Sequence, residues 1–273
     1  MSTAAIQRQY DEVIADNYDL DPQDLTNRML DLALAHLSQE ACLAEGLPPL
    51  KSLDLGMGTG LFFEKLRNAS ARDIQPYGLD VSQRMIDLAR RRIPDLQAVI
   101  DDAANIGSRL VGETFDLVST HFITGFVAID HLAPRIWEKL KPGGYWSFVG
   151  ATSGAYPELQ RKAQSKLLRF LGRGRRFEAT DLITPADCDA VVDCFRRHGF
   201  EVCSAELAEP KLEFPDFDAF MEFAYHGGWL TPFIEEIGLQ RAPPLLQKML
   251  NMIVFPMSDC HRVAIGVARR PLE

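Results

Sequence analysis

The feature that most constrains the fold is a regular alternation of two kinds of segment between residues 48 and 151. Short runs rich in aliphatic, β-branched and aromatic residues are separated by stretches with helical periodicity. This pattern predicts βαβ units and a parallel sheet covered by helices on both faces. The predicted strands of this region are 51–55, 75–81, 97–101, 115–120 and 145–151. Residues 200–207 and 261–269 have the same character and complete a predicted set of seven strands.

The segments around this core are predicted to be mainly helical. A helix is expected to begin at Asp21-Pro22, and a capping box at 184–187 predicts another that ends at Gly199. A chain of 273 residues has room for one large domain with a cap. We therefore predict an α/β fold: a Rossmann-like, seven-stranded, mostly parallel sheet with helices on both faces. The predicted single domain, 1–273, has N-terminal helices in 1–47, a core in 48–151 and helical cap insertions at 152–183 and 212–256.

Charge and composition disfavour several classes of function. The chain has 29 Lys and Arg against 38 Asp and Glu, a net charge of -9, and such a surface repels nucleic-acid phosphates. The five cysteines lack the spacing expected of a zinc site. There is no secretory signal at the start and no apolar stretch near the roughly 18 residues that a membrane span needs. These observations predict a cytoplasmic protein that binds neither nucleic acid, nor membrane, nor metal.

A glycine-rich loop follows the first predicted strand of the core. Its sequence, LDLGMGTG, places Asp54, Gly56, Gly58 and Gly60 between that strand and a helix. Glycines in this position let the backbone approach a ligand closely. The dinucleotide pattern G-x-G-x-x-G would require a glycine where this chain has Leu61, so the loop is not the one expected for NAD. The spacing D-x-G-x-G-x-G favours a ligand with a sugar and an amino-acid tail instead.

Two further acids follow the next two predicted strands. Asp80 ends the second strand, where a carboxylate can accept hydrogen bonds from both hydroxyls of a ribose. Asp102 follows the third strand and is placed to accept a bond from an adenine amino group. Ser82 is the expected N-cap of the helix after Asp80. Because the carboxyl ends of parallel strands meet at one edge of a sheet, the glycines and acids are expected to line one crevice.

In this order of motifs, residues 10–151 resemble the class I S-adenosylmethionine-dependent methyltransferases, especially the small-molecule branch similar to ubiquinone and menaquinone methyltransferases. The resemblance implies S-adenosyl-L-methionine as the cofactor. It implies that the three glycines line the methionine part, that Asp102 and Ala103 contact the adenine, that Met85 packs beneath the adenine, and that Tyr18 lies near the carboxylate. The implied cofactor-binding residues are Tyr18, Asp54, Gly56, Gly58, Gly60, Asp80, Val81, Met85, Asp102 and Ala103.

The methyl acceptor is expected beside the fourth strand. His121, at the end of that strand, is the first candidate catalytic residue, either as the base that removes the acceptor's proton or as a group that positions the acceptor. His226 is the second, in a segment 214–238 that is rich in aromatic residues. This segment is interpreted either as a lid over an apolar acceptor or as helices that pack on the core. A basic cluster within 161–176 is interpreted as a solvated helix face or as a docking face for an anionic partner.

The favoured function is transfer of a methyl group to a small, largely apolar metabolite, with oxygen preferred over carbon and carbon over nitrogen as acceptor. The expected partner is a small-molecule methyl acceptor, and a homo-oligomer is left open. The alternatives are an RNA or protein methyltransferase, and a non-catalytic regulator that binds S-adenosylmethionine. The net charge and the lack of an N/D-P-P-Y motif after the fourth strand argue against a nucleic-acid substrate.

Overall fold

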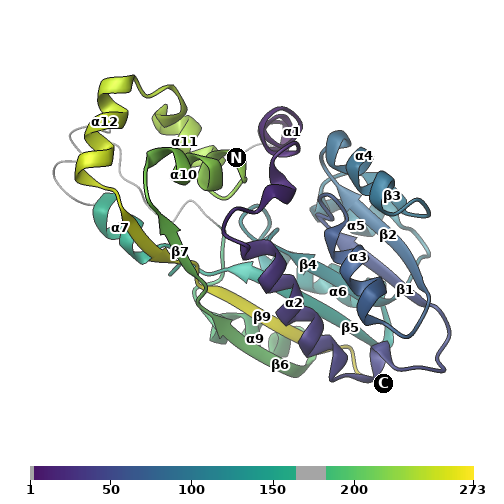
Figure 1. Ribbon diagram of the computed structural model, residues 1–273. Helices are drawn as coiled ribbons and strands as arrows, with labels where there is room; N and C mark the ends of the chain where they lie inside the picture. The colour runs from purple at the N-terminus through teal and green to yellow at the C-terminus, as the bar shows by residue number, and fades with distance from the viewer. Residues whose placement is uncertain (1–2, 164–182) are drawn as a thin grey trace.

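The centre of the molecule is a seven-stranded sheet in the order β3-β2-β1-β4-β5-β9-β6 (Figure 1). The computed structural model describes residues 3–163 and 183–273. Every neighbouring pair among the first five strands is parallel, and β9 is antiparallel to both β5 and β6. The predicted fold class is therefore confirmed. The strands are β1 (Leu50–Leu55), β2 (Ile74–Asp80), β3 (Gln97–Ile100), β4 (Phe115–His121), β5 (Leu140–Ala151), β6 (Glu201–Ala208) and β9 (Val263–Arg269).

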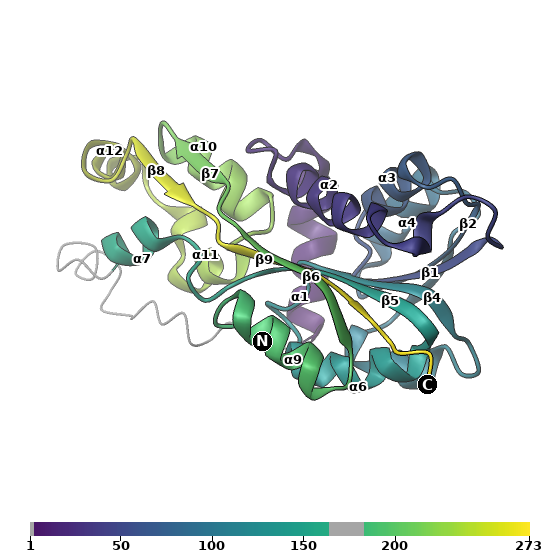
Figure 2. The same ribbon diagram turned by 90° about the horizontal axis from the view of Figure 1, so that it is seen from below.

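Helices cover both faces of this sheet, as Figure 2 shows. On one face lie α2 (Leu25–Ser38), α3 (Leu61–Ala69) and α4 (Gln83–Arg92), and on the other α5 (Ile106–Arg109), α6 (Ile129–Lys139) and α9 (Cys188–Arg197). The strands β4 and β9 are buried along almost their whole length, because both faces are covered. Large apolar side chains such as Trp146, Phe148 and Phe195 fill the space between the sheet and the second helical layer.

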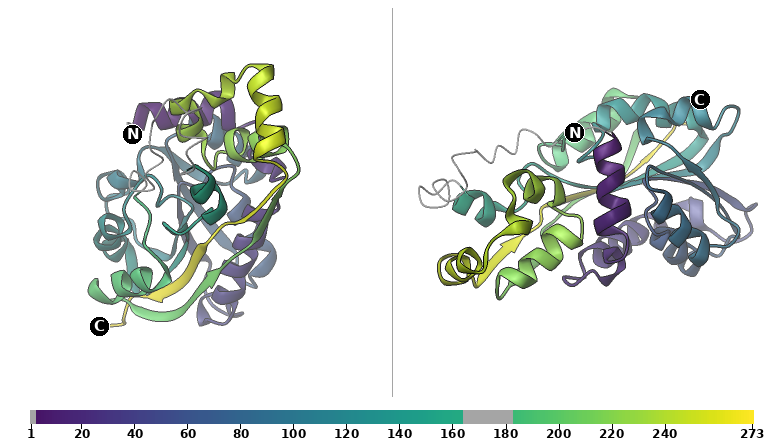
Figure 3. Two further views of the ribbon diagram at one scale, coloured as in Figure 1. Left: turned by 90° about the vertical axis from the view of Figure 1, so that its left-hand side faces the viewer. Right: turned by 90° about the horizontal axis from the view of Figure 1, so that it is seen from above.

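A cap extends from the β6–β9 side of the sheet (Figures 1 and 3). It contains α7 (Pro157–Ala163), α10 (Phe217–Met221), α11 (Thr231–Ile237) and α12 (Pro244–Ile253), and a two-stranded antiparallel sheet of β7 (Lys211–Phe214) and β8 (Met257–Cys260). The small sheet prolongs the large one, since β6 leads into β7 and β8 into β9. The helix α1 (Thr3–Gln9) lies between the cap and the core (Figure 3).

Three local predictions need correction. The insertion 212–256 is not wholly helical, because its first residues belong to strand β7, which has only four residues, too few for a clear alternating pattern. The helix α2 begins at Leu25 rather than Pro22, although the Asp21 carboxylate accepts bonds from Leu25 N–H (2.9 Å) and Asn27 N–H (3.0 Å). The N-cap of α9 is Asp187, whose carboxylate accepts from Ala190 N–H at 2.9 Å. Within the described residues, no helix is long and apolar enough to cross a bilayer.

Candidate active site

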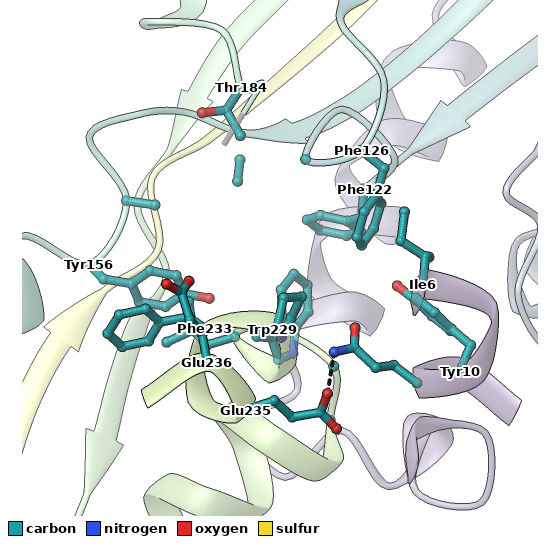
Figure 4. Close-up of a pocket in the computed structure, with 18 of the residues that line it drawn as sticks. Ile6, Tyr10, Phe122, Phe126, Tyr156, Thr184, Trp229, Phe233, Glu235 and Glu236 are labelled. Atoms are coloured by element: carbon teal, nitrogen blue, oxygen red, sulfur yellow. Dashed lines mark hydrogen bonds between the residues drawn. The ribbon is translucent and has the colours of Figure 1, made fainter. Parts of the chain in front are cut away.

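A cavity of about 1060 Å³ opens at the carboxyl ends of the parallel strands, between the core, α1 and the cap. Its volume is at the upper end of the range of roughly 300–1,000 Å³ typical of small-molecule sites. One end is lined by the glycine loop and the end of β2, and the other by aromatic side chains from the cap and from the loops after β4 and β5. Figure 4 shows Phe122, Trp229 and Tyr156 around this second end. The cavity is therefore large enough for a cofactor and an acceptor together.

The glycine loop is held against the end of β2 by its backbone. Gly56 N–H donates to the Leu79 carbonyl at 2.7 Å, and Gly56 has φ +69°. A Cβ at Gly56 would lie 2.2 Å from Ile123 Cγ2, so a side chain does not fit there. Gly56 and Gly58 line the cavity. Gly60 has another position: it is the N-cap of α3, where its hydrogen atom faces Ala89 of α4.

Asp80 is 7% exposed and lies at the end of β2, on the cavity wall. One carboxylate oxygen accepts the Gly58 N–H at 2.9 Å and the other accepts the Ser82 N–H, also at 2.9 Å. Burial raises the pKa of Asp80 to about 6, although hydrogen bonds from Ser82 and Gly58 oppose the shift. Each oxygen keeps one lone pair free of these bonds, and so the carboxylate fits two hydroxyls of a sugar.

The next wall of the cavity is formed by Val81, Asp102 and Ala103, together with Asp101. Asp102 is the N-cap of a short 3-10 turn, and one of its oxygens accepts the Ala104 N–H at 2.9 Å. The other oxygen accepts the hydroxyl of Thr3, from α1, at 2.8 Å. Asp102 is thus placed beside the cavity but is already bonded on both oxygens.

Besides Gly60, two of the predicted cofactor residues, Asp54 and Met85, do not line this cavity. Asp54 is 3% exposed beneath the glycine loop, where Ser119 Oγ donates to it at 2.7 Å. Burial raises the pKa of Asp54 to about 7. Met85 is fully buried among Ile14 and Ala15, so it packs the N-terminal segment onto α4. The resemblance implied a place beneath the adenine for Met85, whereas its buried neighbours in the structure are side chains of the N-terminal segment.

The N-terminal segment contributes a wall that sequence reasoning had largely missed. Both Tyr18 and Tyr10 line the cavity. The segment is bonded to the core by Ser82 Oγ, which donates to Asp11 at 2.5 Å. It is bonded to the cap by Gln9 Nε2, which donates to Glu235 at 2.7 Å (Figure 4). A pattern of apolar residues gave no sign of these contacts, which join segments up to 226 positions apart.

His121 lies at the end of β4, 8% exposed, and lines the cavity. Its Nε2 is 3.0 Å from Ser147 Oγ, while its Nδ1 has no partner among the described residues. Burial lowers the pKa of His121 to about 3, so the imidazole is neutral in the physiological range. A neutral ring with an unpartnered nitrogen can bind a polar atom of a ligand.

The other candidate histidine lies elsewhere. His226 ends a π-helical turn (Glu222–His226), is exposed and is not among the residues that line the cavity. Within the same segment it is Trp229 that lines the cavity. Of the basic cluster, Arg161 pairs with Glu158 at 2.6 Å and Lys162 donates to the Val254 carbonyl at 2.5 Å. The remaining members, Lys166, Arg169, Arg173, Arg175 and Arg176, lie outside the described residues.

One group of side chains within the described residues has the spacing of metal ligands. Ligand atoms of Asp130, Cys194 and His198 lie within 4.8 Å of one another. The Asp130 carboxylate is, however, paired with Arg197 at 2.6 Å. Burial is the main cause that raises the pKa of Cys194 to about 12, which keeps it a thiol. We therefore assign this group to an ion pair between α6 and α9.

Comparison with known proteins adds to this geometry. Residues 53–144 match the family model of a methyltransferase domain. A ubiquinone biosynthesis O-methyltransferase from Chelativorans sp. (strain BNC1) is 32% identical over 117 residues, which cover 42% of this chain and 45% of that protein. A structure of a candidate methyltransferase from Bacillus halodurans C-125 is 16% identical, with a TM-score of 0.57, over 87% of this chain and 98% of that one. The plantazolicin methyltransferase BamL, solved in complex with a triazolic desmethylPZN analog and SAH, is 13% identical, with a TM-score of 0.53, over 98% of this chain and 95% of that one.

The seven-stranded fold, the glycine loop and the acid at the end of β2 define a methyltransferase domain of the Rossmann-like class. Its core, residues 53–144, is thus a methyltransferase domain, and the chain is similar in sequence to an O-methyltransferase and in fold to solved methyltransferases. It spans less than half the length of the curated relative that it matches, and the structural matches are distant in sequence. These likenesses establish the fold, and the reaction of this chain is argued below from its own residues.

Proposed function

We propose that this protein transfers a methyl group from S-adenosylmethionine to a small, largely apolar acceptor, with oxygen favoured over carbon or nitrogen as the methylated atom. The observation that carries the proposal is the continuity of the cavity. The same space is lined by Gly56, Gly58 and Asp80 at one end and by aromatic residues of the cap at the other. A cofactor at the first end would face an acceptor at the second, with His121 between them on the cavity wall.

The cofactor end suits S-adenosylmethionine residue by residue. Asp80 would hold the ribose hydroxyls, Asp102 and Ala103 would lie beside the adenine, and the backbone of Gly56 and Gly58 would lie beside the methionine part. When bound, this cofactor supplies an electrophilic methyl group on a sulfonium. The contribution of the protein is to hold the acceptor atom in line with that methyl group and to exclude water.

At the acceptor end, His121 is the group best placed to position the attacking atom. Its neutral ring can accept a hydrogen bond from a hydroxyl through the unpartnered Nδ1, while Ser147 fixes the orientation of the ring through Nε2. A hydroxyl held in this way is directed toward the methyl group by its own hydrogen bond. The preference for oxygen is supported by this geometry and by the O-methyltransferase to which the chain is similar.

The alternatives are less well supported. An RNA substrate would meet a net charge of -9, and the two cationic side chains that line the described part of the cavity, Arg8 and Lys162, are bonded to Glu235 and to a backbone carbonyl. A protein substrate or a purely regulatory role would leave the aromatic end of the cavity without a purpose. Methyl transfer to a small apolar acceptor accounts for both ends of the cavity, because the cofactor fills one end and the acceptor the other.

The test is calorimetric titration of the purified protein with S-adenosylmethionine, S-adenosylhomocysteine and NAD. The first two are expected to bind and NAD is not, because the loop has Leu61 where a dinucleotide loop has glycine. Incubation with methyl-labelled cofactor and a panel of phenols, carbon acids and amines then shows which atom is methylated. Binding of NAD without binding of S-adenosylhomocysteine would overturn the proposal.

A further inference from the structure

A second polar site lies in the aromatic end of the cavity, around His261. This residue joins β8 to β9, is 1% exposed and lines the cavity. Neither of its ring nitrogens has a hydrogen-bond partner among the described residues. The hydroxyl of Tyr156, whose ring centroid is 4.6 Å from that of His261, is likewise buried and without a partner. Buried polar atoms are normally bonded, and so three unpartnered ones at a cavity wall require an explanation.

The surroundings of His261 are aromatic. The Trp229 ring lies 5.1 Å from the imidazole, edge to face, and the Phe122 ring 6.4 Å from it. Trp229 and Phe122 also contact each other at 4.9 Å, and both border the cavity (Figure 4). Burial lowers the pKa of His261 to about 3, so the ring is a neutral donor and acceptor.

Two of the residues that carry these rings have a strained backbone conformation. Phe122 has φ +58° and Tyr156 has φ +57°, in the left-handed region that side chains seldom adopt. Phe122 N–H donates to the Val149 carbonyl at 2.7 Å and Tyr156 N–H to the Cys260 carbonyl at 2.9 Å, and these bonds maintain both conformations. Such strain persists where the surrounding structure fixes it, often at a ligand site.

His261 is distinct from the site at His121. In the sheet, His121 pairs with Val149, which pairs with Ile265 of β9, two strands away. His261 lies four positions before Ile265, on the side of the cap. Two strand spacings and four residue rises give about 10 Å across the strands and about 13 Å along them, so the two α-carbons are on the order of 15 Å apart. The two histidines therefore lie at separate points of the cavity wall.

We propose that His261 and Tyr156 bind a second polar group of the acceptor, a hydroxyl remote from the atom that receives the methyl group. The inference rests on the proposed methyl transfer and narrows its substrate class to neutral, largely aromatic compounds with at least two polar ends. Neutrality is indicated because no cationic side chain among the described lining residues is left to balance an anion, Arg8 and Lys162 being already bonded. Aromaticity is indicated by the rings of Phe122, Tyr156 and Trp229.

The test compares two probes that differ by one hydroxyl, biphenyl and 4-phenylphenol, with the protein saturated with S-adenosylhomocysteine. Binding is followed by quenching of tryptophan fluorescence, to which Trp229 contributes from the cavity wall. The variants are His261→Phe, which keeps a ring of similar size but removes both nitrogens, and Tyr156→Phe, which removes only the hydroxyl. The control is His131→Phe, at an exposed position of α6 outside the cavity.

The wild type is expected to bind 4-phenylphenol about tenfold more tightly than biphenyl, the size of one hydrogen bond to a buried partner. His261→Phe should abolish the difference in affinity between the two probes, and Tyr156→Phe should reduce it. Both variants should keep the wild-type affinity for S-adenosylhomocysteine, and neither should unfold at a lower temperature than the wild type. His131→Phe should change neither probe. Equal binding of the two probes to the wild type, or binding of neither, overturns the inference, as does an unchanged preference in both cavity variants. Failure of the wild type to bind S-adenosylhomocysteine would instead overturn the proposed function.

Discussion

The carboxylate of Asp80 offers the sharpest single test of the cofactor site. The substitution Asp80→Asn keeps the size of the side chain but exchanges one acceptor oxygen for an NH₂ group. In the structure both oxygens accept backbone N–H groups, from Gly58 and from Ser82, each at 2.9 Å. The amide oxygen can keep one of these bonds, while the NH₂ group faces the other N–H. The variant therefore loses one internal bond and one charged acceptor for the ribose.

The magnitude can be worked for affinity and for stability separately. Loss of a charged acceptor should cost about 1–3 kcal/mol of cofactor affinity, or roughly one to two decades in dissociation constant. Burial raises the pKa of Asp80 from 3.8 to about 6, so its ionisation lowers the stability of the fold as pH rises from about 4 to about 6, and the loss is complete above that range. At neutral pH this penalty is about 3 kcal/mol, and the variant is free of it. Since the lost N–H bond costs about 1.5–3 kcal/mol, the two effects on stability nearly cancel.

The pH dependence follows from the same shift. If the ionised carboxylate binds the ribose, wild-type affinity for S-adenosylhomocysteine should fall about tenfold between about pH 8 and pH 5, as Asp80 takes up a proton. Asp80→Asn should bind weakly at both pH values, without this change. Calorimetry gives the affinities and thermal unfolding checks the fold. The control is Asp87→Asn, an exposed acid on α4. Full affinity in Asp80→Asn would show that the ribose is held elsewhere.

Three other changes test the remaining parts of the site. Burial lowers the pKa of His121 to about 3, so the pH–rate profile of the wild type should show no inflection near pH 6.5 that comes from this histidine. The His121→Asn variant should have the same profile and keep its rate of methyl transfer within about tenfold of the wild type. Gly56→Ala should lose cofactor binding in calorimetry and unfold at a lower temperature, since its Cβ would lie 2.2 Å from Ile123; retention of both would refute the packing of the loop. Glu235→Gln should speed amide hydrogen exchange in Thr3–Gln9, because it weakens the bonds of Glu235 to Arg8 and Gln9 that hold α1 against the cap. The unfolding temperature should hardly change, since Arg8 is partly exposed and such an ion pair contributes little to stability. Unchanged exchange would show that α1 is held by other contacts.

The parts of the molecule that could be predicted from the sequence are those whose causes are local. The strands of the parallel sheet and the helices between them follow from alternation over 10 to 15 residues. The position of Asp80 beside the glycine loop follows too, because adjacent parallel strands bring their carboxyl ends to one edge. The Ser82 cap is confirmed, with its hydroxyl accepting the Met85 N–H at 3.0 Å. In each case the pattern and the contact lie within one βαβ unit.

The acceptor end could not be predicted in this way, since it is assembled from distant segments. His261 and Tyr156 are separated by more than a hundred positions, and neither stands in a recognisable motif. The side-chain directions of Phe122 and Tyr156 depend on a left-handed backbone conformation that the residue types themselves disfavour. His226 was a candidate because it lies in the aromatic-rich segment 214–238, but it ends a π-helical turn outside the cavity, and Trp229 lines the wall instead.

The two ends of the cavity are built from different parts of the fold, and this difference affects substrate specificity. In the proposed function the cofactor end has to fit a single molecule, and the groups that we assign to it are backbone atoms and one carboxylate that the core strands position rigidly. The acceptor end is formed by the loops after β4 and β5 and by the cap, where β7 and β8 prolong the sheet and His261 links β8 to β9. Substitutions in the cap can therefore change the shape of the acceptor end without disturbing the glycine loop or Asp80. We accordingly expect the cap, rather than the sheet, to determine which compound is methylated.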